Sequence, residues 1–325
     1  KKSNEILIDD GVFENIANIY EKEGSDCWFS DDPQKFLGSK YKAEDFEKLS
    51  DIVEVWFDSG STHSFVLEKR KDLKWPASMY LEGSDQHRGW FHSSLLESCG
   101  TRGKAPFESI LSHGFVVDGK GLKMSKSLGN VIAPEDILKK YGADILRIWV
   151  AASNYAEDLR IDYSILDQHS ESYRKIRNTF RYLLGNINDK YEDVNLDKID
   201  VDSLPELEKF MLSKIHSLNN KFENYFKKYD FHNLYKELLN FCTTDLSAFY
   251  FDIRKDTLYC DPINSEKRKS CVTILNVLLK SLLRWFAPIL SFTTEEIHQL
   301  ISKNTKSIHL EKFLTFPDKF KNEQL

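Results

Sequence analysis

The sequence has no C-x-x-C pair, although it contains five cysteines. Their number is odd and they lie far apart in the chain, so the sequence predicts neither a disulfide framework nor a zinc knuckle. A reducing compartment, the cytoplasm, is therefore the expected location. The five are Cys27, Cys99, Cys242, Cys260 and Cys271.

The chain also lacks a long uninterrupted apolar run. The most apolar stretch, residues 272–292, contains Asn276, Lys280, Arg284 and Pro288, which excludes a comfortable membrane span. The first residues include neither an initiator Met nor an apolar signal core. We therefore expect no membrane partner, and we expect the chain to be a piece of a longer protein.

There is no excess of basic residues. The chain contains 45 Lys and Arg residues and 51 Asp and Glu residues, which gives a net charge of −6. This charge excludes a wholly basic nucleic-acid binder but permits a local basic patch. Hydrophobic residues make up 41% and charged residues 30%, which excludes global disorder. Because one core rarely exceeds roughly 250 residues, 325 residues indicate two or more domains.

Between residues 51 and 117, short apolar runs alternate with helical stretches and end in glycine-bearing loops. This alternation predicts a parallel α/β sheet, whose ligands bind at the carboxyl ends of the strands. Asp58, Glu82 and the loop around Gly119 would lie there. The three predicted strands are Val53–Phe57, Met79–Leu81 and Ile110–Val117.

The second half of the chain is predicted to be helical. Pro134 suits the first position of a helix and Gly142 suits its end. A capping-box pattern at residues 293–296 is expected to open a late helix, and residues 186–205 are expected to form a loop. Amphipathic periodicity predicts a bundle with helices near 164–186, 205–228, 230–251 and 266–287.

The most specific motif is Lys-Met-Ser-Lys-Ser at residues 123–127, between Gly121 and Gly129. Two lysines three residues apart in a glycine-hinged loop can close over a polyphosphate, because a lysine ammonium is compact and mobile. Serine hydroxyls and loop amides can add hydrogen bonds to phosphate oxygens. The blander interpretation, an ordinary solvated loop, is disfavoured by the exact pentapeptide and its glycine flanks.

This pentapeptide resembles a signature of the class I aminoacyl-tRNA synthetases. The rest of the sequence is similar to the isoleucine branch of this family, strongly from about residue 51 to 292 and weakly at both ends. The resemblance implies the second half of a Rossmann-like parallel-sheet catalytic domain followed by an α-helical anticodon-binding bundle. Its motifs are Asp51–His63, Tyr80–Phe91, Gly103–Pro106, His113–Phe115, Tyr141–Arg147 and Tyr173–Thr179.

The resemblance implies roles in binding the aminoacyl-adenylate. Glu82 is similar to the family carboxylate that binds it, and Gly83, Asp85 and Gln86 would hold its ribose and aminoacyl parts. His87 and His92 beside Asp85 are weak evidence for a metal, so we expect no metal site in this chain.

Further roles concern adenine, the amino acid and the pyrophosphate. His113 and Gly114 are expected to contact adenine, although a histidine that caps the sheet is an equal alternative. Trp56 and Trp90 resemble the indoles that flank the isoleucine side chain, with core packing as the alternative. Lys126, with Lys123, would stabilise the leaving pyrophosphate of ATP accompanied by Mg²⁺.

A basic helix face is a candidate surface for tRNA(Ile). Its apolar side chains recur at helical spacing and leave the basic ones outward. A plain solvated helix face is the alternative. The candidate residues are Arg174, Lys175, Arg177 and Arg181, with a second cluster at 267–269.

Three family features are missing from these residues: a His-x-Gly-His motif, the proofreading insert and the C-terminal zinc module, so zinc is expected only in the parent. We predict residues 1–50 to include the strand that rejoins the catalytic core, 51–162 to be its second half and 163–325 the anticodon-binding domain. The parent would be a monomeric isoleucine–tRNA ligase that consumes isoleucine and ATP, with the chain alone inactive. The rival hypothesis is a non-catalytic tRNA- or nucleotide-binding module.

Overall fold

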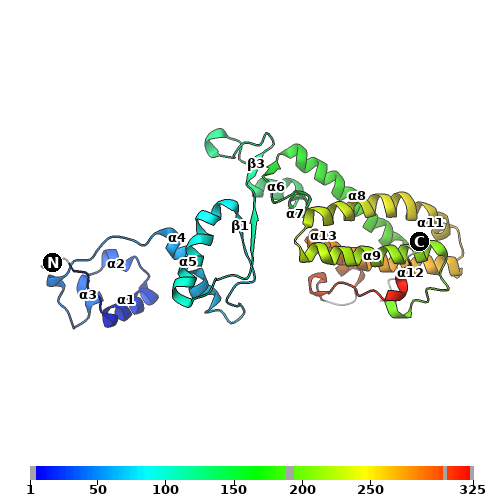
Figure 1. Ribbon diagram of the computed structural model, residues 1–325. Coiled ribbons are helices and arrows are strands. Elements are labelled where there is room, and N and C mark those ends of the chain that lie inside the picture. Colours follow the sequence, from blue (N-terminus) through cyan, green and yellow to red (C-terminus); the bar gives the residue numbers. More distant parts are fainter. Residues whose placement is uncertain (1–4, 188–193, 303–305, 323–325) are drawn as a thin grey trace. The chain divides into compact units, whose positions relative to one another are not determined.

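The computed structural model describes residues 5–187, 194–302 and 306–322 (Figure 1). The chain divides into two compact units, which are described separately below. The first unit comprises Lys1–Tyr80 and Asp85–Ile110, and the second comprises Leu81–Ser84 and Leu111–Leu325.

The N-terminal part of the first unit is helical, so the strand expected within residues 1–50 is wrong for the residues described. Its first helix, α1, starts where the Asp9 carboxylate accepts a hydrogen bond from the Val12 amide at 3.2 Å. Phe36 is buried and packs against the rings of Tyr20 and Trp28. The elements are α1 (Asp10–Glu23), α2 (Cys27–Ser30), α3 (Pro33–Leu37) and η1 (Ala43–Asp45).

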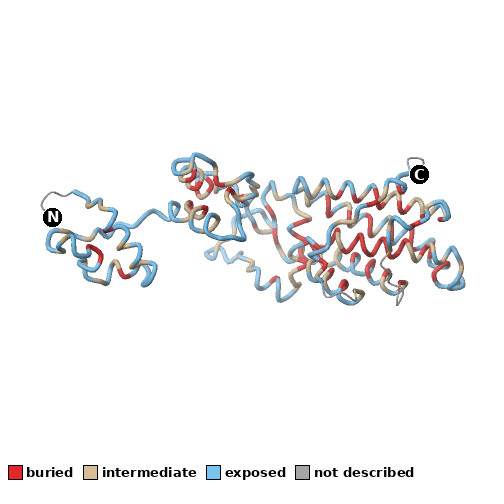
Figure 2. The backbone as a smooth tube through the Cα atoms, turned by 90° about the horizontal axis from the view of Figure 1, so that it is seen from below, coloured by how far each residue is buried: buried red, intermediate tan, exposed pale blue. Residues whose placement is uncertain are grey.

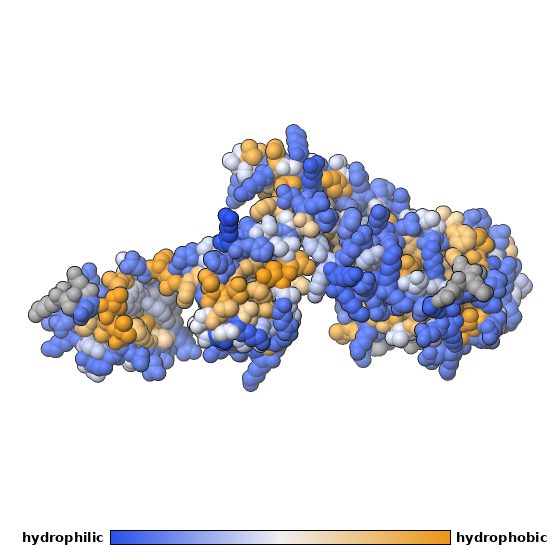
Figure 3. All heavy atoms as spheres, in the orientation of Figure 1, coloured by the Kyte–Doolittle hydropathy of each residue, from blue (hydrophilic) through white to orange (hydrophobic). Residues whose placement is uncertain are grey.

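The strand predicted at Val53–Phe57 is also wrong. The segment enters helix α4 (Val55–Gly60), whose first turn is capped by Glu54: its carboxylate accepts from the Trp56 amide at 2.7 Å. No strand pairs with this segment in the described part of the chain, and its apolar side chains remain exposed. Figure 3 shows hydrophobic residues gathered on the visible surface of the N-terminal unit.

The predicted strand near residue 80 and the helix after it are confirmed. They are β1 (Tyr80–Gly83) and α5 (Trp90–Arg102), joined by η3 (Ser84–Arg88). The Tyr80 ring stacks on Trp90 with centroids 4.2 Å apart, and its hydroxyl lies 3.1 Å from Ser94 Oγ. Helix α5 packs against α4, and η2 (His63–Leu67) follows α4.

The single strand predicted at 110–117 is two strands in the structure. They are β2 (Ile110–His113), which pairs with β1, and β3 (Val116–Asp118), which pairs in parallel with β4 (Leu159–Ile161). The break lies at Gly114, whose amide donates to Tyr155 O at 2.9 Å. A Cβ there would lie 2.3 Å from Glu157 O, so this backbone contact requires glycine.

The remainder of the second unit is a helical bundle, as predicted, although the helix expected at 230–251 continues to residue 259. Pro134 opens α6 and Gly142 ends it with φ of 84°, and part of the loop predicted at 186–205 lies outside the described residues. The elements are η4 (Lys126–Leu128), α6 (Pro134–Tyr141), α7 (Ala143–Ala152), α8 (Tyr163–Ile187), η6 (Leu196–Lys198), α9 (Glu206–Lys227), α10 (Phe231–Asn240), η7 (Phe241–Tyr250), α11 (Phe251–Tyr259), α12 (Glu266–Phe286), α13 (Ser291–Ile301), η8 (Ile308–Leu310) and η9 (Asp318–Phe320).

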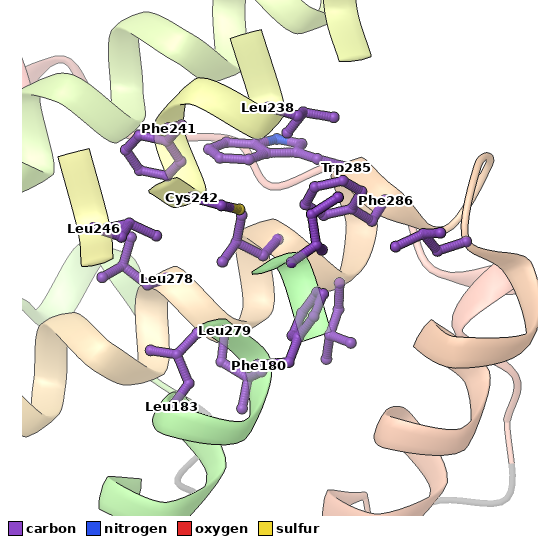
Figure 4. Close-up of a cluster of buried hydrophobic side chains, with 14 of the residues drawn as sticks. Phe180, Leu183, Leu238, Phe241, Cys242, Leu246, Leu278, Leu279, Trp285 and Phe286 are labelled. Carbon is purple, nitrogen blue, oxygen red and sulfur yellow. The ribbon is translucent and has the colours of Figure 1, made fainter. Parts of the chain in front are cut away.

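The core of the bundle forms around α12, which is buried along most of its length (Figure 2). Figure 4 shows Leu278, Leu279 and Phe286 among side chains from α8, α10 and η7. Within the described ranges, no helix is both long enough and apolar enough to cross a membrane.

The capping box predicted at 293–296 is wrong, because α13 begins at Ser291 and Asp144 of α7 caps it instead. The buried Asp144 carboxylate accepts from the Thr293 amide at 2.8 Å and from its hydroxyl at 2.6 Å. Arg147 donates to Ile289 O at 2.9 Å. Helix α7 therefore fixes the start of a helix almost 150 residues later in the chain.

Candidate functional site

The two tryptophans predicted to flank an amino-acid side chain both belong to the first unit. Trp90 is half-buried, stacks on Tyr80 and donates from Nε1 to Ser59 O at 2.8 Å. Trp56 is 42% exposed. Its indole edge lies 3.4 Å from where a Cβ at Gly89 would be, so the glycine lets it pack beside the start of α5. The structure brings the two indoles to the same helix start.

Gln86 and Asp85, also in the first unit, lie directly before that helix. The Gln86 side-chain oxygen accepts from the Trp90 amide at 3.0 Å, and its nitrogen donates to Asp85 at 3.3 Å. Gln86 is thereby a helix cap in this structure, whereas Asp85 is exposed. Their expected contact with an adenylate stays a prediction.

Glu82, Gly83, His113 and Gly114 lie in the second unit, on or directly after β1 and β2. The exposed Glu82 carboxylate has no hydrogen-bond or ion-pair partner among the described residues. His113 Nδ1 lies 2.8 Å from Gly114 O. Because a carbonyl only accepts, Nδ1 carries a proton, and in the tautomer with a single ring proton Nε2 is an acceptor. Such a nitrogen can accept from an exocyclic amine.

The loop with Lys123 and Lys126 follows β3 in the second unit. Both lysines are exposed, and neither side-chain ammonium group has a carboxylate or hydrogen-bond partner in the described part of the chain. Gly121 with φ of 83° and Gly129 with φ of 65° flank the loop, in a backbone region that favours glycine. Two unpaired cations on a glycine-flanked loop form a site suited to phosphate oxygens.

Asp118 and Asn130, which the sequence argument did not single out as site residues, hold the two ends of this loop together. The Asn130 amide donates to the Asp118 carboxylate at 2.9 Å and to Lys123 O at 3.3 Å, and its oxygen accepts from the Ser125 amide at 2.9 Å. Asp118 also accepts from the Leu122 amide at 2.8 Å. The Asn130 hydrogen bond, followed by that of Leu122, lowers the pKa of Asp118.

The serines of the loop form its last turn. Ser125 caps the short helix η4, accepting from the Leu128 amide at 3.2 Å, and its hydroxyl lies 3.1 Å from Ser127 Oγ. Lys126 is the first residue of η4. The backbone position of Lys126 is thus set by a capped turn whose capping residue, Ser125, is also bonded to Asn130.

The four basic residues predicted to face RNA lie on α8 of the second unit and are all exposed, while Ile176 and Phe180 of the same helix are buried. The predicted amphipathic face is therefore confirmed. Arg174 pairs with Glu171 of its own helix, whereas Arg181 has no partner among the described residues. A hollow of about 320 Å³ opens beside it, lined by Asn178, Arg181, Tyr182, Gly185, Asn186 and Tyr259.

His87 and His92 are exposed side chains of the first unit, and the His87 ring contacts Phe91. In the described residues no group of three or more His, Cys, Asp or Glu side chains is placed to hold a metal ion. The expectation of a metal-free chain stays a prediction.

Two family models match the chain. Residues 1–162 match the class I tRNA synthetases for I, L, M and V, and residues 208–325 match the anticodon-binding domain of tRNA ligases. The chain therefore belongs to the class I aminoacyl-tRNA synthetases.

The relatives narrow this to one branch. The chain is 77% identical over 325 residues, its whole length, to 36% of the isoleucine–tRNA ligase of Pelagibacter ubique. It is 47% identical over 322 residues, 98% of the chain, to 32% of that of Mesorhizobium japonicum. The chain thus spans about a third of the length of these curated relatives, as expected for part of a longer ligase.

Two solved structures share the fold. The ternary complex of an Agrobacterium radiobacter LeuRS with tRNA and LeuAMS superposes with a TM-score of 0.66 at 16% identity, covering 85% of this chain and 34% of that one. The Mycobacterium tuberculosis methionyl-tRNA synthetase with methionyl-adenylate gives a TM-score of 0.62 at 18% identity, covering 78% and 52%. The predicted fold class, part of a class I catalytic domain followed by a helical anticodon-binding domain, is confirmed.

Proposed function

We propose that the chain supplies one side of the catalytic site and the tRNA-facing helices of an isoleucine–tRNA ligase. The reaction joins isoleucine to ATP with release of pyrophosphate and then passes the isoleucyl group to tRNA(Ile). The observation that carries the proposal is the glycine-flanked loop with two unpaired lysines, together with 77% identity to an isoleucine–tRNA ligase.

No side chain needs to act as a nucleophile in this reaction. The carboxylate of isoleucine attacks the α-phosphorus of ATP and pyrophosphate leaves, so the catalyst must orient the two reactants and stabilise the growing charge on pyrophosphate. Lys126, exposed on the capped turn η4, would contribute most of this stabilisation and Lys123 would assist it. Mg²⁺ would accompany ATP as part of the substrate.

Polar side chains on or directly after β1 and β2 would hold the adenylate. Glu82, with an unpaired carboxylate, would accept hydrogen bonds from its polar groups, and Nε2 of His113 would accept from the adenine amine. Trp56 and Trp90 would enclose the isoleucine side chain. Apolar enclosure discriminates weakly between side chains that differ by one methylene, worth about 1–3 kcal/mol.

Phosphates of tRNA(Ile) would lie against the exposed basic face of α8. Lysine and arginine contacts to phosphate supply most of the sequence-independent affinity for nucleic acid. The hollow beside Arg181 adds two tyrosines, Tyr182 and Tyr259, on which an unstacked base could stack. A monomeric parent, cytoplasmic location and domain boundaries at residues 50 and 162 belong to the same proposal.

The proposal is tested with a chimeric ligase, called the graft below. The 325 residues replace their counterpart in the Pelagibacter ubique ligase, and isoleucine-dependent exchange between ATP and pyrophosphate is measured. Because the two sequences are 77% identical, we expect exchange within about tenfold of the unaltered ligase. A folded graft that binds tRNA but catalyses no exchange would refute the proposal and support the rival, a non-catalytic tRNA- or nucleotide-binding module.

A further inference from the structure

A third cationic residue lies at the hinge of the lysine loop. Arg160 belongs to β4, where it is paired with Val117 of β3. Val117 also forms a bridge with Lys123 on its other side. Arg160 and the first lysine of the loop are therefore separated by one strand, although they are 37 positions apart in the chain.

The guanidinium of Arg160 lies against Gly121. A Cβ at Gly121 would be 3.5 Å from Arg160 Nη2 and 3.7 Å from both Cζ and Nε. Three atoms of the planar group at nearly equal distance indicate that its face covers the glycine. Contact through the face leaves the N–H groups along the edge free for a ligand, the geometry in which arginine binds two oxygens of one phosphate.

The carboxylates nearest to Arg160 in the sequence have other partners. Asp158 accepts from the Phe115 amide at 2.8 Å, and Asp162 accepts from the Ile165 amide at 2.8 Å at the start of α8. Both hydrogen bonds stabilise the backbone around β4. They leave the guanidinium of Arg160 exposed and without a hydrogen-bond or ion-pair partner in the described ranges, while its backbone carbonyl accepts from Trp149 Nε1 at 2.9 Å.

Unpaired arginines are concentrated in this segment. Seven of the eleven arginines have a carboxylate or carbonyl partner, namely Arg70, Arg102, Arg147, Arg174, Arg254, Arg268 and Arg284. Three of the other four, Arg160, Arg177 and Arg181, lie on β4 and α8. In a chain of net charge −6, exposed arginines without a partner among the described residues favour binding of phosphates.

We propose that Arg160 is a further phosphate-binding residue, which holds a phosphate group at the hinge of the lysine loop. This inference rests on the proposed function, and it assigns a role to a residue outside the signature motif. The phosphate belongs either to the pyrophosphate end of the nucleotide or to the RNA backbone. Both present the same oxyanion to the free edge of the guanidinium.

The test uses the 325-residue chain and three variants. Arg160→Gln removes the charge, Arg160→Lys keeps the charge but not the two-pronged edge, and Lys255→Gln is a matched control on α11, where Lys255 pairs with Asp252. Calorimetry measures binding of magnesium pyrophosphate, and fluorescence anisotropy measures binding of tRNA(Ile) at two salt concentrations. Circular dichroism melting confirms that each variant is folded.

We expect Arg160→Gln to lower the affinity of the chain for one of the two ligands at least fivefold. Arg160→Lys should lower that affinity by an intermediate factor, and Lys255→Gln should bind both ligands like the parent. Weaker pyrophosphate binding with unchanged tRNA binding identifies the nucleotide as the source. Weaker tRNA binding, with a slope of log affinity against log salt concentration that is smaller by about one, identifies the RNA backbone as the source of the phosphate.

Two results overturn the inference, and they are distinguishable. If the unaltered chain binds a ligand and Arg160→Gln binds it equally well, Arg160 has no such role and the proposed function stands. If the unaltered chain binds neither ligand while folded, the proposed function fails as well.

Discussion

The side-chain amide of Asn130 donates to the carboxylate of Asp118 at 2.9 Å, and this contact closes the base of the loop that carries Lys123 and Lys126. Asn130 also accepts from the Ser125 amide inside the loop. One side chain thus connects the strand before the loop, the loop itself and the segment after it.

Asn130→Ala should release the loop without unfolding the protein. A hydrogen bond contributes about 1 kcal/mol net, so the Ser125 amide should exchange its hydrogen roughly five- to tenfold faster in the chain. Asn233→Ala is the matched control, because the Asn233 side chain donates to Asp230 at the start of α10, away from the loop. Equal exchange at Ser125 in the parent and in Asn130→Ala would contradict this role.

The same loop should depend on pH through Asp118. Hydrogen bonds, first that of Asn130, lower the pKa of Asp118 in the folded protein. A group with a depressed folded pKa contributes stability above its unfolded pKa, about 3.9, and that contribution is lost as the pH falls through the folded pKa. Exchange of the Leu122 amide should therefore accelerate in acid beyond its intrinsic change. Asp118→Asn should remove this additional pH dependence of Leu122 amide exchange. If the dependence persists in Asp118→Asn, another titrating group causes it.

Lys126→Ala in the graft should slow adenylate formation while leaving isoleucine binding nearly unchanged. A preorganised group that stabilises transition-state charge is typically worth about 10²–10³ in rate. Pyrophosphate exchange gives the rate, and quenching of tryptophan fluorescence gives isoleucine affinity. An exchange rate within a few-fold of the parent graft would remove Lys126 from this role.

Arg174→Glu combined with Arg177→Glu should weaken tRNA binding much more than folding. Both side chains are exposed, and the pair between Arg174 and Glu171 is 67% and 63% exposed, so it contributes little stability. We expect the free energy of unfolding to change by less than about 1 kcal/mol. The affinity for tRNA(Ile) should fall together with its salt slope. Unchanged affinity and slope would mean that this face of α8 contacts only solvent.

Arg254→Met should destabilise the helical bundle strongly. Arg254 donates to the fully buried Glu208 at 2.7 and 2.6 Å, and Tyr250 donates to the same carboxylate at 3.2 Å. Breaking such a buried pair typically costs about 3–5 kcal/mol, because it leaves an uncompensated charge. Urea unfolding measures the cost, and adding Glu208→Gln should recover part of it. Lys255→Gln, one residue away but exposed, should cost little.

Much of the helical half could be predicted from the sequence, because its signals are local. The 3.6-residue period located α8, α9 and α12, and Pro134 and Gly142 marked both ends of α6. The capping box at 293–296 failed because the first turn of α13 is capped by Asp144, a contact across almost 150 residues that no local pattern contains.

The α/β part was harder to predict. Val53–Phe57 has the composition of a strand, but a strand needs a partner, and the described residues provide none. At Gly114 the chain bends because its amide bonds to Tyr155, again a long-range contact. The lysine loop could be predicted because its motif is contiguous, whereas Asp118 and Asn130 are marked only by side-chain hydrogen bonds across the loop and Arg160 only by its contact with Gly121.

The most direct test of the central claim, that these residues hold only one side of the catalytic site, is pyrophosphate exchange with the purified 325-residue chain. The sequence contains no His-x-Gly-His motif, which the resemblance to the family places on the other side of the nucleotide. Without that side ATP is not aligned with the isoleucine carboxylate, and effective molarity worth about 7–11 kcal/mol is lost. We predict a folded chain, verified by circular dichroism, with no isoleucine-dependent exchange above background. Sustained isoleucine-dependent exchange by the pure, folded chain would contradict the account and show that these residues contain a complete active site.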